Sequence, residues 1–207
     1  MSEIINYELT PLLSIIESQF PQTIGLPSTE SNITRSIYTN PIQLDSISIY
    51  HEFIDLMEIT IGNHYRRVDG KEWKIHKLEE MKHNGLVYIS YHHENDLVGF
   101  LSFVITMDEF EMKRIFYLYE IHVSPKYQKL KLGTKLIKNY HKLINRLNDT
   151  IYKDVDTFKL TVFSSNSIPL NWYKKMGYKL AEDSPNDKQL RNGKVIKPNY
   201  YILIKES

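Results

Sequence analysis

The sequence contains no cysteine, so disulfide bonds and a covalent cysteine intermediate are excluded. It has no apolar run near the roughly 20 residues needed to cross a bilayer. Met1 to Phe20 also lacks the basic start and apolar centre of a signal peptide. The formal net charge is only +1 over 207 residues, so wholesale binding of nucleic acid is not expected. These absences favour an intracellular, water-soluble protein with neither a nucleic-acid nor a membrane partner.

The chain divides at about residue 45 into an extension and a main domain. Ile4 to Phe20 has the apolar spacing of a helix, and a loop rich in Ser, Thr and Asn is predicted from there to Pro41. Residues 46–207 hold the stronger patterns, and 42% hydrophobic residues are enough for a sizeable core. We therefore predict residues 1–45 as a helix and loop packed on, or trailing from, one domain over residues 46–207.

The main domain contains helices, then strands, then helices and strands in alternation. We predict helices over Leu44–Val68, Glu72–His83, 132–147 and Ile168–Met176, and strands over Leu86–His92, Leu97–Thr106, Arg114–Val123, Phe158–Phe163, Tyr178–Ala181 and Tyr200–Ile204. The predicted buried stripes are Ile49, Phe53, Leu56 and Ile59 in the first helix, and Leu132, Leu136, Ile137, Tyr140, Leu143, Ile144 and Leu147 in the third. This order is typical of an α/β domain with one mixed sheet and helices on both faces.

The predicted strand Arg114–Val123 leads through a lysine-rich loop, residues 124–131, to the N-terminus of the long helix. Free backbone N–H groups and the positive end of the helix dipole meet at such a junction, which suits a pyrophosphate. Lys126, Lys129 and Lys131 add positive charge there. An ordinary strand–loop–helix connection with a solvated basic loop explains the same residues, so this segment alone leaves both interpretations open.

Two motifs resemble the GNAT superfamily of N-acetyltransferases. The first, Val123 through Gly133, is similar to its acetyl-CoA loop, Q/R-x-x-G-x-G/A, with Gln128 and Gly133 in place and Lys131 where the first glycine is usual. Lys131 restricts the approach of the backbone to the pyrophosphate, but it keeps its N–H and adds an ammonium. The resemblance implies acetyl-CoA as cofactor, bound by His122, Val123, Gln128, Lys129, Leu130, Lys131, Leu132, Gly133 and Thr134.

The second motif is a strand, an asparagine and a helix that ends in an aromatic–glycine pattern. Leu160 to Phe163, Asn166, and Tyr173 to Tyr178 resemble the corresponding GNAT block. The resemblance implies the GNAT (acyl-CoA N-acyltransferase) fold, an α/β fold whose mixed central sheet has splayed middle strands with the pantetheine arm in the gap. Asn166 and Tyr173 would then contact the cofactor. A plain helix N-cap is the competing interpretation of Asn166.

Within this superfamily the chain resembles the N-alpha-acetyltransferase D (NatD) family, which acetylates histone N-termini. The resemblance is carried by Trp73 with Lys77 to Met81, by Asp108 ahead of Tyr117-Leu118-Tyr119-Glu120, and by Leu160 to Phe163 with Glu182 to Pro185. It implies the N-terminal serine of histone H4 and histone 2A as acceptor, action without an auxiliary subunit, and a location in cytoplasm and nucleus. The implied substrate contacts are Trp73, Asp108, Tyr117, Tyr119, Glu120 and Tyr200.

Glu120 is the candidate general base. Strict alternation along the strand would put Phe116, Leu118, Glu120 and His122 on one largely apolar face, where burial would raise the pKa of the carboxyl. Tyr117 and Tyr119 would flank the open end of the strand and hydrogen-bond the acceptor amine, so these two and Glu120 are the candidate catalytic residues. Tyrosines that only pack, and a Glu120 that only pairs with a lysine, explain the same residues.

An α-amine suits such a site because its pKa is about 7.7–8.0, against about 10.4 for lysine. Direct attack on the thioester is expected, with the oxyanion met by a backbone N–H near Val123. Two alternatives remain open: a GNAT enzyme for another protein N-terminus or a small amine, and an inactive GNAT module that binds basic tails. The eight histidines form no metal-ligand motif, so no metal is expected.

Overall fold

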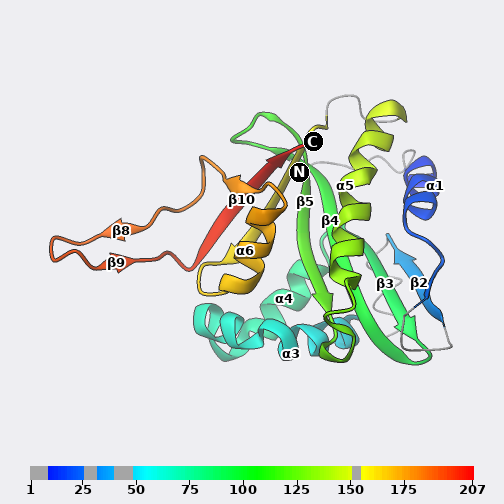
Figure 1. Ribbon diagram of the computed structural model, residues 1–207, viewed down its shortest axis with the longest axis horizontal. Helices are drawn as coiled ribbons and strands as arrows, with labels where there is room; N and C mark the ends of the chain where they lie inside the picture. Colours follow the sequence, from blue (N-terminus) through cyan, green and yellow to red (C-terminus); the bar gives the residue numbers. More distant parts are fainter. Residues whose placement is uncertain (1–8, 26–31, 40–48, 151–154) are drawn as a thin grey trace.

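A mixed sheet forms the centre of the molecule (Figure 1). The computed structural model describes residues 9–25, 32–39, 49–150 and 155–207. In spatial order the sheet contains β1 (Thr23–Gly25), β2 (Asn32–Tyr38), β3 (Val87–His93), β4 (Asp96–Asp108), β5 (Lys113–Val123), β6 (Thr157–Phe163), β10 (Tyr200–Glu206) and β7 (Lys179–Leu180). Strands β5 and β6 pair in parallel, and the other neighbours pair antiparallel. This confirms the predicted mixed sheet.

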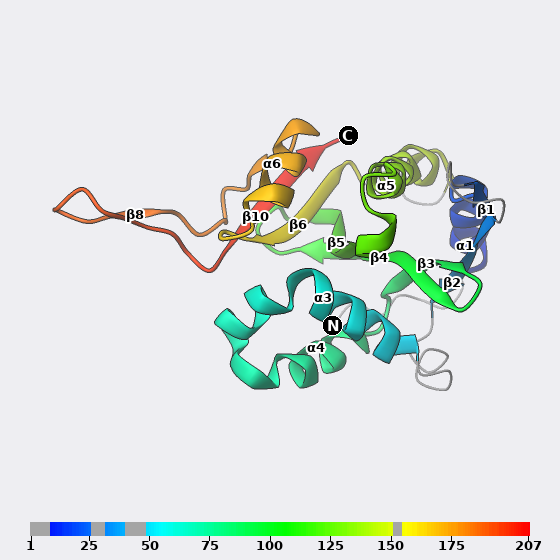
Figure 2. The same cartoon turned by 60° about the horizontal axis from the view of Figure 1, so that its bottom comes forward.

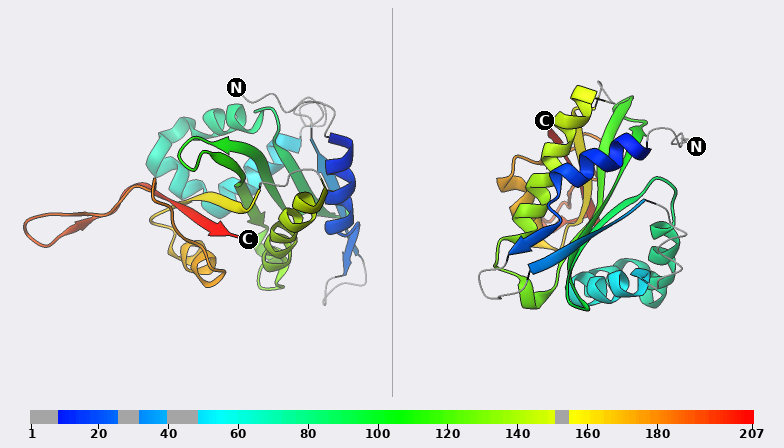
Figure 3. Two further views of the ribbon diagram at one scale, coloured as in Figure 1. Left: turned by 90° about the horizontal axis from the view of Figure 1, so that it is seen from above. Right: turned by 90° about the vertical axis from the view of Figure 1, so that its right-hand side faces the viewer.

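Helices cover both faces of the sheet (Figure 2). One face carries α3 (Ile49–Asp69) and α4 (Trp73–Met81), joined by a 3-10 turn over Gly70–Glu72. The other carries α1 (Leu9–Gln19), α5 (Leu132–Thr150) and α6 (Ser167–Lys175), and α1 packs against α5 (Figure 3). A separate apolar core lies under each face, the larger one beneath α1, α5 and α6.

The periodic stripes explain how α3 and α5 pack. All seven stripe residues predicted for α5 are at most 3% exposed. In α3, Ile49, Phe53 and Leu56 are buried as predicted, but Ile59 is 67% exposed. From Phe53 to Leu56, and again from Leu56 to Ile59, the helix advances three residues, which is about 60° short of a full turn. The two shortfalls together carry Ile59 out of the buried stripe.

The predicted loop after the first helix is wrong for residues 23–25 and 32–38, which form β1 and β2. Strand β2 pairs along β3, from Thr34–His92 to Tyr38–Tyr88, and Ile33 is fully buried. Ser, Thr and Asn favour loops locally, but here an available edge of the sheet determines the structure. The predicted boundary at residue 45 therefore lies between strands of one sheet. Residues 1–8 and 40–48, where both predicted helices of this region begin, are outside the described residues.

A two-stranded hairpin that the patterns did not predict projects from the body between β7 and β10 (Figure 1). It consists of β8 (Lys188–Gln189) and β9 (Val195–Ile196), joined by a turn with Gly193 in the left-handed region. Strands of two residues are too short to produce a visible alternation. Within the described ranges, no helix combines the length and the apolar character needed to cross a membrane.

Candidate active site

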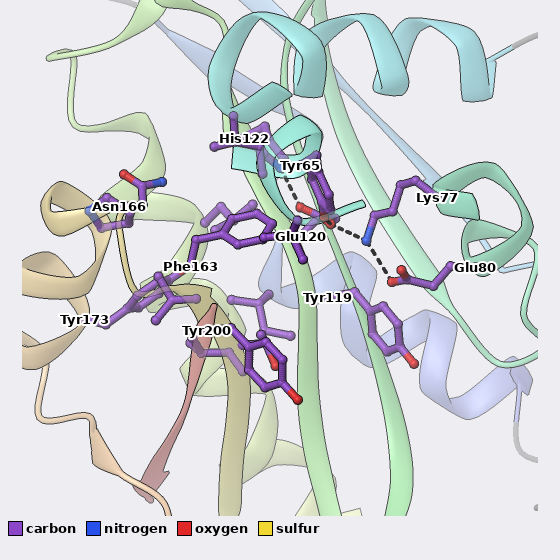
Figure 4. A pocket seen from close by; sticks show the side chains of 18 of the residues that line it. Tyr65, Lys77, Glu80, Tyr119, Glu120, His122, Phe163, Asn166, Tyr173 and Tyr200 are labelled. Carbon is purple, nitrogen blue, oxygen red and sulfur yellow. Dashed lines mark hydrogen bonds and ion pairs between the residues drawn. The ribbon is translucent and has the colours of Figure 1, made fainter. Parts of the chain in front are cut away.

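The parallel strands β5 and β6 pair at only three positions and then diverge. Their register runs from Phe116–Phe158 to Leu118–Leu160, although β5 continues to Val123 and β6 to Phe163. A cavity of about 420 Å³ opens beside the diverging ends. Its lining comes from α3 and α4 on one side of β5, and from β6, α6 and the start of β10 on the other (Figure 4). The splayed middle strands are therefore present.

A β-bulge at Tyr119 determines which side chains of β5 enter this cavity. Ser102 of β4 pairs with Glu120, whereas the next residue, Phe103, pairs with Leu118, so Tyr119 is an extra residue on β5. Leu118 belongs to the core under α5, while Glu120 contacts Tyr65 of α3 on the opposite face. The prediction that Leu118 and Glu120 share a face is wrong, because strict alternation does not hold across a bulge.

Three side chains donate hydrogen bonds to the buried Glu120 carboxylate. The Tyr65 hydroxyl lies 2.8 Å from Oε1, and the ammonium of Lys77 pairs with the same oxygen. His122 Nε2 lies 2.6 Å from Oε2. The other ring nitrogen of His122, Nδ1, lies 2.7 Å from Thr60 Oγ1. Glu120 is thus held from α3, from α4 and from its own strand.

These partners reverse the expected pKa of Glu120. Burial acts to raise it, but the neighbouring Lys77 and the hydrogen bond from His122 outweigh burial and hold the pKa at about 2. The prediction of a raised pKa is therefore wrong. It considered the apolar surroundings of the strand and missed a lysine that approaches from another helix. Glu120 is an anion at neutral pH.

Three tyrosines proposed as substrate contacts line the same cavity. The rings of Tyr117 and Tyr119 meet edge to face with centroids 5.3 Å apart. The hydroxyl of Tyr117 lies 2.5 Å from Thr161 Oγ1 across the widening gap. Tyr200, at the start of β10, is 40% exposed and stands opposite Tyr119 in Figure 4. The structure thus brings Glu120 and all three tyrosines together.

Two other proposed substrate contacts lie elsewhere. Trp73 is 2% exposed and stacks under Tyr65 with ring centroids 4.7 Å apart, so its ring supports the cavity wall and does not line the cavity. Asp108 is likewise absent from the lining. One of its oxygens accepts backbone N–H bonds from Phe110 and Glu111, and the other accepts a bond from Lys159. The position of Asp108 shortly before Tyr117 to Glu120 in the sequence did not reveal these internal partners.

The proposed cofactor loop has a glycine-like backbone although lysines occupy it. Lys129 and Lys131 have φ angles of +63° and +61°, in the left-handed region that favours glycine. Gln128 Nε2 donates to the Val123 carbonyl at 2.9 Å and so ties the loop to the end of β5. Leu130 and Leu132 pack on the core. The side chains of these two leucines therefore point to the protein interior, while the Lys129 and Lys131 side chains are exposed.

The β6–α6 junction supplies the other wall. Asn166 occupies the N-cap position of α6 but makes no side-chain capping hydrogen bond, and it lines the cavity with Tyr173. The plain N-cap interpretation of Asn166 therefore loses its main support. His122 also lines the cavity, but both of its ring nitrogens are engaged. Across the described part of the chain, no group of three or more His, Asp or Glu residues is arranged to hold a metal ion.

Sequence reasoning missed Tyr65, Lys77 and Glu80 as residues of the site. Lys77 was visible in one respect, because Trp73, Lys77 and Met81 are the buried residues of α4 and recur every four residues. A lysine within an apolar stripe signals a buried ion pair. Its partner could not be read from the sequence, since Glu120 lies 43 positions later on another element.

Comparisons with known proteins agree with this geometry. Residues 83–180, just under half of the chain, match the acetyltransferase (GNAT) domain family model. The chain is 31% identical over 150 residues to N-alpha-acetyltransferase 40 of Saccharomyces cerevisiae, an alignment that covers 64% of this chain and 52% of that relative. The chain thus spans about half the length of this curated relative.

Two solved structures show the same fold at low identity. PaiA N-acetyltransferase of Thermoplasma acidophilum, in complex with coenzyme A, has a TM-score of 0.54 at 15% identity and covers 84% of this chain and 99% of its own. NAA60 of Arabidopsis thaliana, in complex with a bisubstrate analogue, has a TM-score of 0.51 at 15% identity and covers 84% and 98%. The chain has the GNAT fold, and its residues 83–180 match the GNAT acetyltransferase domain.

Proposed function

We propose that this GNAT-fold protein is an acetyl-CoA-dependent N-alpha-acetyltransferase that acts on the N-terminal serine of histone H4 and histone 2A. The observation that carries the proposal is the cavity between the diverging ends of β5 and β6, which places Glu120 opposite Asn166 and Tyr173. The name of the yeast relative supports a protein N-terminus as acceptor. The histone assignment rests on the NatD resemblance, as does a nuclear and cytoplasmic location.

The residues around the gap between the diverging ends of β5 and β6 fit acetyl-CoA. Beyond Leu118, the edge of β5 that faces β6 has no pairing with that strand, so backbone groups there are available to a ligand. The first N–H groups of α5 and the ammonium groups of Lys129 and Lys131 suit a pyrophosphate. The Asn166 side chain, which caps nothing, faces the cavity. Acetyl-CoA would supply the thioester that the acceptor amine attacks, with CoA leaving as the thiol.

The charge of the cavity suits a cationic acceptor. Asp69, Glu80 and Glu120 line it together with the single lysine Lys77, which leaves an excess of carboxylates. Tyr119 and Tyr200 offer aromatic surface and hydroxyl groups where a peptide would enter. In this proposal Asp108 and Trp73 do not touch the acceptor, because the first is engaged by Lys159 and the second is buried.

Glu120 is too weak a base to take a proton outright from the acceptor. With a pKa of about 2, it lies far below an α-amine, whose pKa is about 7.7–8.0, so full proton transfer is strongly unfavourable. Roughly a tenth of α-amines are already neutral at pH 7. We therefore assign Glu120 to orienting the neutral amine by accepting its hydrogen bond, after the amine has lost its proton to water. The lysine ε-amine, with fewer than about one neutral group in a thousand, is a poor substrate for such a site.

The test is acetyl transfer from acetyl-CoA to the peptide Ser-Gly-Arg-Gly-Lys, with the modified position read by mass spectrometry. The matched control is the same peptide with a blocked N-terminus, which keeps the lysine and removes the α-amine. We expect acetylation of the free peptide at its N-terminus and none of the blocked peptide. Acetylation of the lysine with none at the N-terminus would overturn the proposal.

A panel of acceptors tests the histone assignment separately. Peptides that begin with other residues, and a polyamine, are compared with the Ser-Gly-Arg peptide by kcat/KM. A preference for another N-terminus would leave an N-alpha-acetyltransferase with a different substrate, whereas a preference for the polyamine would place the enzyme in another class. Calorimetry with CoA tests the premise of both, because a chain that binds no CoA cannot be the proposed enzyme.

A further inference from the structure

Lys77 is a buried cation whose side chain reaches the centre of the proposed acceptor site. It is 5% exposed, and its ammonium pairs with Glu120 Oε1 and lies 2.7 Å from Glu80 Oε1. The rings of Tyr65 and Tyr119 lie 5.5 and 6.0 Å from it, within range of cation–π attraction. Figure 4 shows Lys77 between the two carboxylates. Lys77 therefore contacts both Glu120 and the side chains around it.

Lys77 stands out among the groups that surround Glu120. The titratable groups that face this carboxylate are Tyr65 from α3, Lys77 with Glu80 behind it from α4, Tyr88 from β3, His122 from β5 and Tyr173 from α6. Burial acts to lower the pKa of Lys77, but its ion pair with Glu120 and the neighbouring Tyr65 hydroxyl and Glu80 carboxylate outweigh burial and hold that pKa well above its ordinary value. Lys77 is therefore charged throughout the working range.

We propose that Lys77 is a positioning residue of the acceptor site, a built-in counter-ion that keeps Glu120 ionised and turned toward the acceptor amine. The inference rests on the proposed function and goes beyond it by assigning a part to a residue outside the substrate contacts. With Lys77 and Tyr65 both on Oε1 and His122 on Oε2, the second lone pair of Oε2 stays available. The carboxylate can then offer the amine one fixed acceptor position.

Without Lys77, burial and the repulsion from the second carboxylate, Glu80, favour the protonated form of Glu120. The hydrogen bonds from Tyr65 and His122 still favour the ionised form, but no lysine then helps them. A buried carboxylate without its cation takes up a proton at higher pH. A protonated Glu120 donates where it should accept, so it can no longer orient the amine. A variant without Lys77 should therefore lose activity first at acidic pH.

The test compares pH profiles of kcat/KM for wild type, Lys77→Met, Lys77→Arg and Lys74→Met. Lys74 is the matched control, because it lies one turn away on α4 and its ion pair with Glu58 is exposed. Protonation of the acceptor amine lowers kcat/KM in acid for every variant, so each profile is divided by that of wild type. We expect the ratio for Lys77→Met to fall as pH falls, by up to about tenfold per pH unit once Glu120 is protonated, whereas the ratios for Lys77→Arg and Lys74→Met stay constant. A ratio for folded Lys77→Met that does not change with pH would overturn the inference.

Carboxyl carbon NMR of Glu120, assigned by its loss in Glu120→Gln, gives a readout that needs no activity. We expect the Glu120 signal to titrate at higher pH in Lys77→Met than in wild type, and an unchanged titration contradicts the proposal. This separates the two claims. If no acceptor is acetylated but the Glu120 titration moves, the proposed function fails while the role of Lys77 in setting the charge of Glu120 stands.

If Lys77→Met does not fold at neutral pH, the double variant Lys77→Met/Glu120→Gln takes its place in thermal unfolding. Glutamine removes the buried charge that Lys77 balanced, so we expect the double variant to fold and to unfold at a higher temperature than the single one. A double variant that is no more stable than Lys77→Met would show that Lys77 does not act through Glu120.

Discussion

The ammonium of Lys159 lies 2.8 Å from Asp108 Oδ2, a contact that joins β6 to the end of β4. Lys159 is 1% exposed and also donates to Asp183 at 2.9 Å. Burial acts to raise the pKa of Asp108, but the bond from Lys159 and those from the backbone outweigh it and lower that pKa. A carboxylate with its charge already balanced has little attraction left for a substrate arginine.

We expect Asp108→Asn to weaken the fold and to leave recognition of the third acceptor residue unchanged. The variant leaves the buried Lys159 with Asp183 alone, at a cost of about 1–3 kcal/mol in the free energy of unfolding. Urea unfolding measures this cost, and Asp156→Asn is the control, since its pair with Lys113 is exposed and worth at most about 1 kcal/mol. A KM that rises for the Arg peptide but not for an Ala peptide would return Asp108 to substrate binding.

The ionised Glu120 predicts how stability changes in acid. Its pKa is about 2 in the folded chain against an ordinary value of 4.5, so its stabilising contribution is complete above about pH 4.5 and is lost as pH falls toward 2. Denaturant unfolding at several pH values should show a gap between wild type and Glu120→Gln that narrows over this interval. A gap that stays constant would mean that the carboxylate charge contributes nothing to stability.

The regular spacing of apolar residues made the main helices and strands predictable, and the motifs predicted that β5 and β6 diverge. The stripe from Leu132 to Leu147 fixed both the position and the buried face of α5. The order of strand, loop and helix around Gln128 and Asn166 led to the GNAT fold and hence to strands that diverge beyond Leu118. These features are local in sequence, so sequence patterns suffice to find them.

The chemistry of the site depended on contacts that are not local. One extra residue at Tyr119 moves Glu120 to the other face of β5, and alternation of residue types gives no sign of it. Lys77 reaches Glu120 from α4 and changes the direction of its pKa shift. Strand β2 forms because the edge of β3 is free to pair, although its own composition favours a loop. Each of these depends on which elements meet in three dimensions.

Lys131→Gly should raise stability slightly and weaken the electrostatic part of CoA binding. Lys131 holds φ at +61°, a conformation that costs a non-glycine residue about 1–2 kcal/mol. Part of that gain is offset by the entropy of glycine in the unfolded chain, so we expect a net gain of up to about 1 kcal/mol. The salt dependence of CoA affinity should fall with the lost ammonium. Lys126→Gly, in the 3-10 turn Pro125–Tyr127, should show no such gain, and equal gains would rule out backbone strain as the cause.

The two glycines next to the β5–α5 junction should respond in opposite ways to alanine. A Cβ on Gly99 would lie 2.6 Å from the His122 carbonyl oxygen, so β4 and β5 must separate beside the cavity. A Cβ on Gly133 would meet Val123 Cγ2 at 3.6 Å, an ordinary contact. We expect Gly99→Ala to cost about 1–3 kcal/mol and Gly133→Ala to be neutral or to add up to about 1 kcal/mol, as measured by thermal unfolding. The reverse order would contradict the close approach of β4 to β5.

Asn166→Ala separates a ligand contact from a helix cap. An N-cap that loses its side-chain bond costs a protein about 1 kcal/mol, but Asn166 makes no such bond and its side chain faces the cavity. We therefore expect unchanged thermal unfolding of the free protein, together with a weaker CoA affinity in calorimetry. Ser167→Ala, at the first residue of α6, is the control for general effects at this helix end. A loss of stability in Asn166→Ala without a change in CoA affinity would make Asn166 a structural cap.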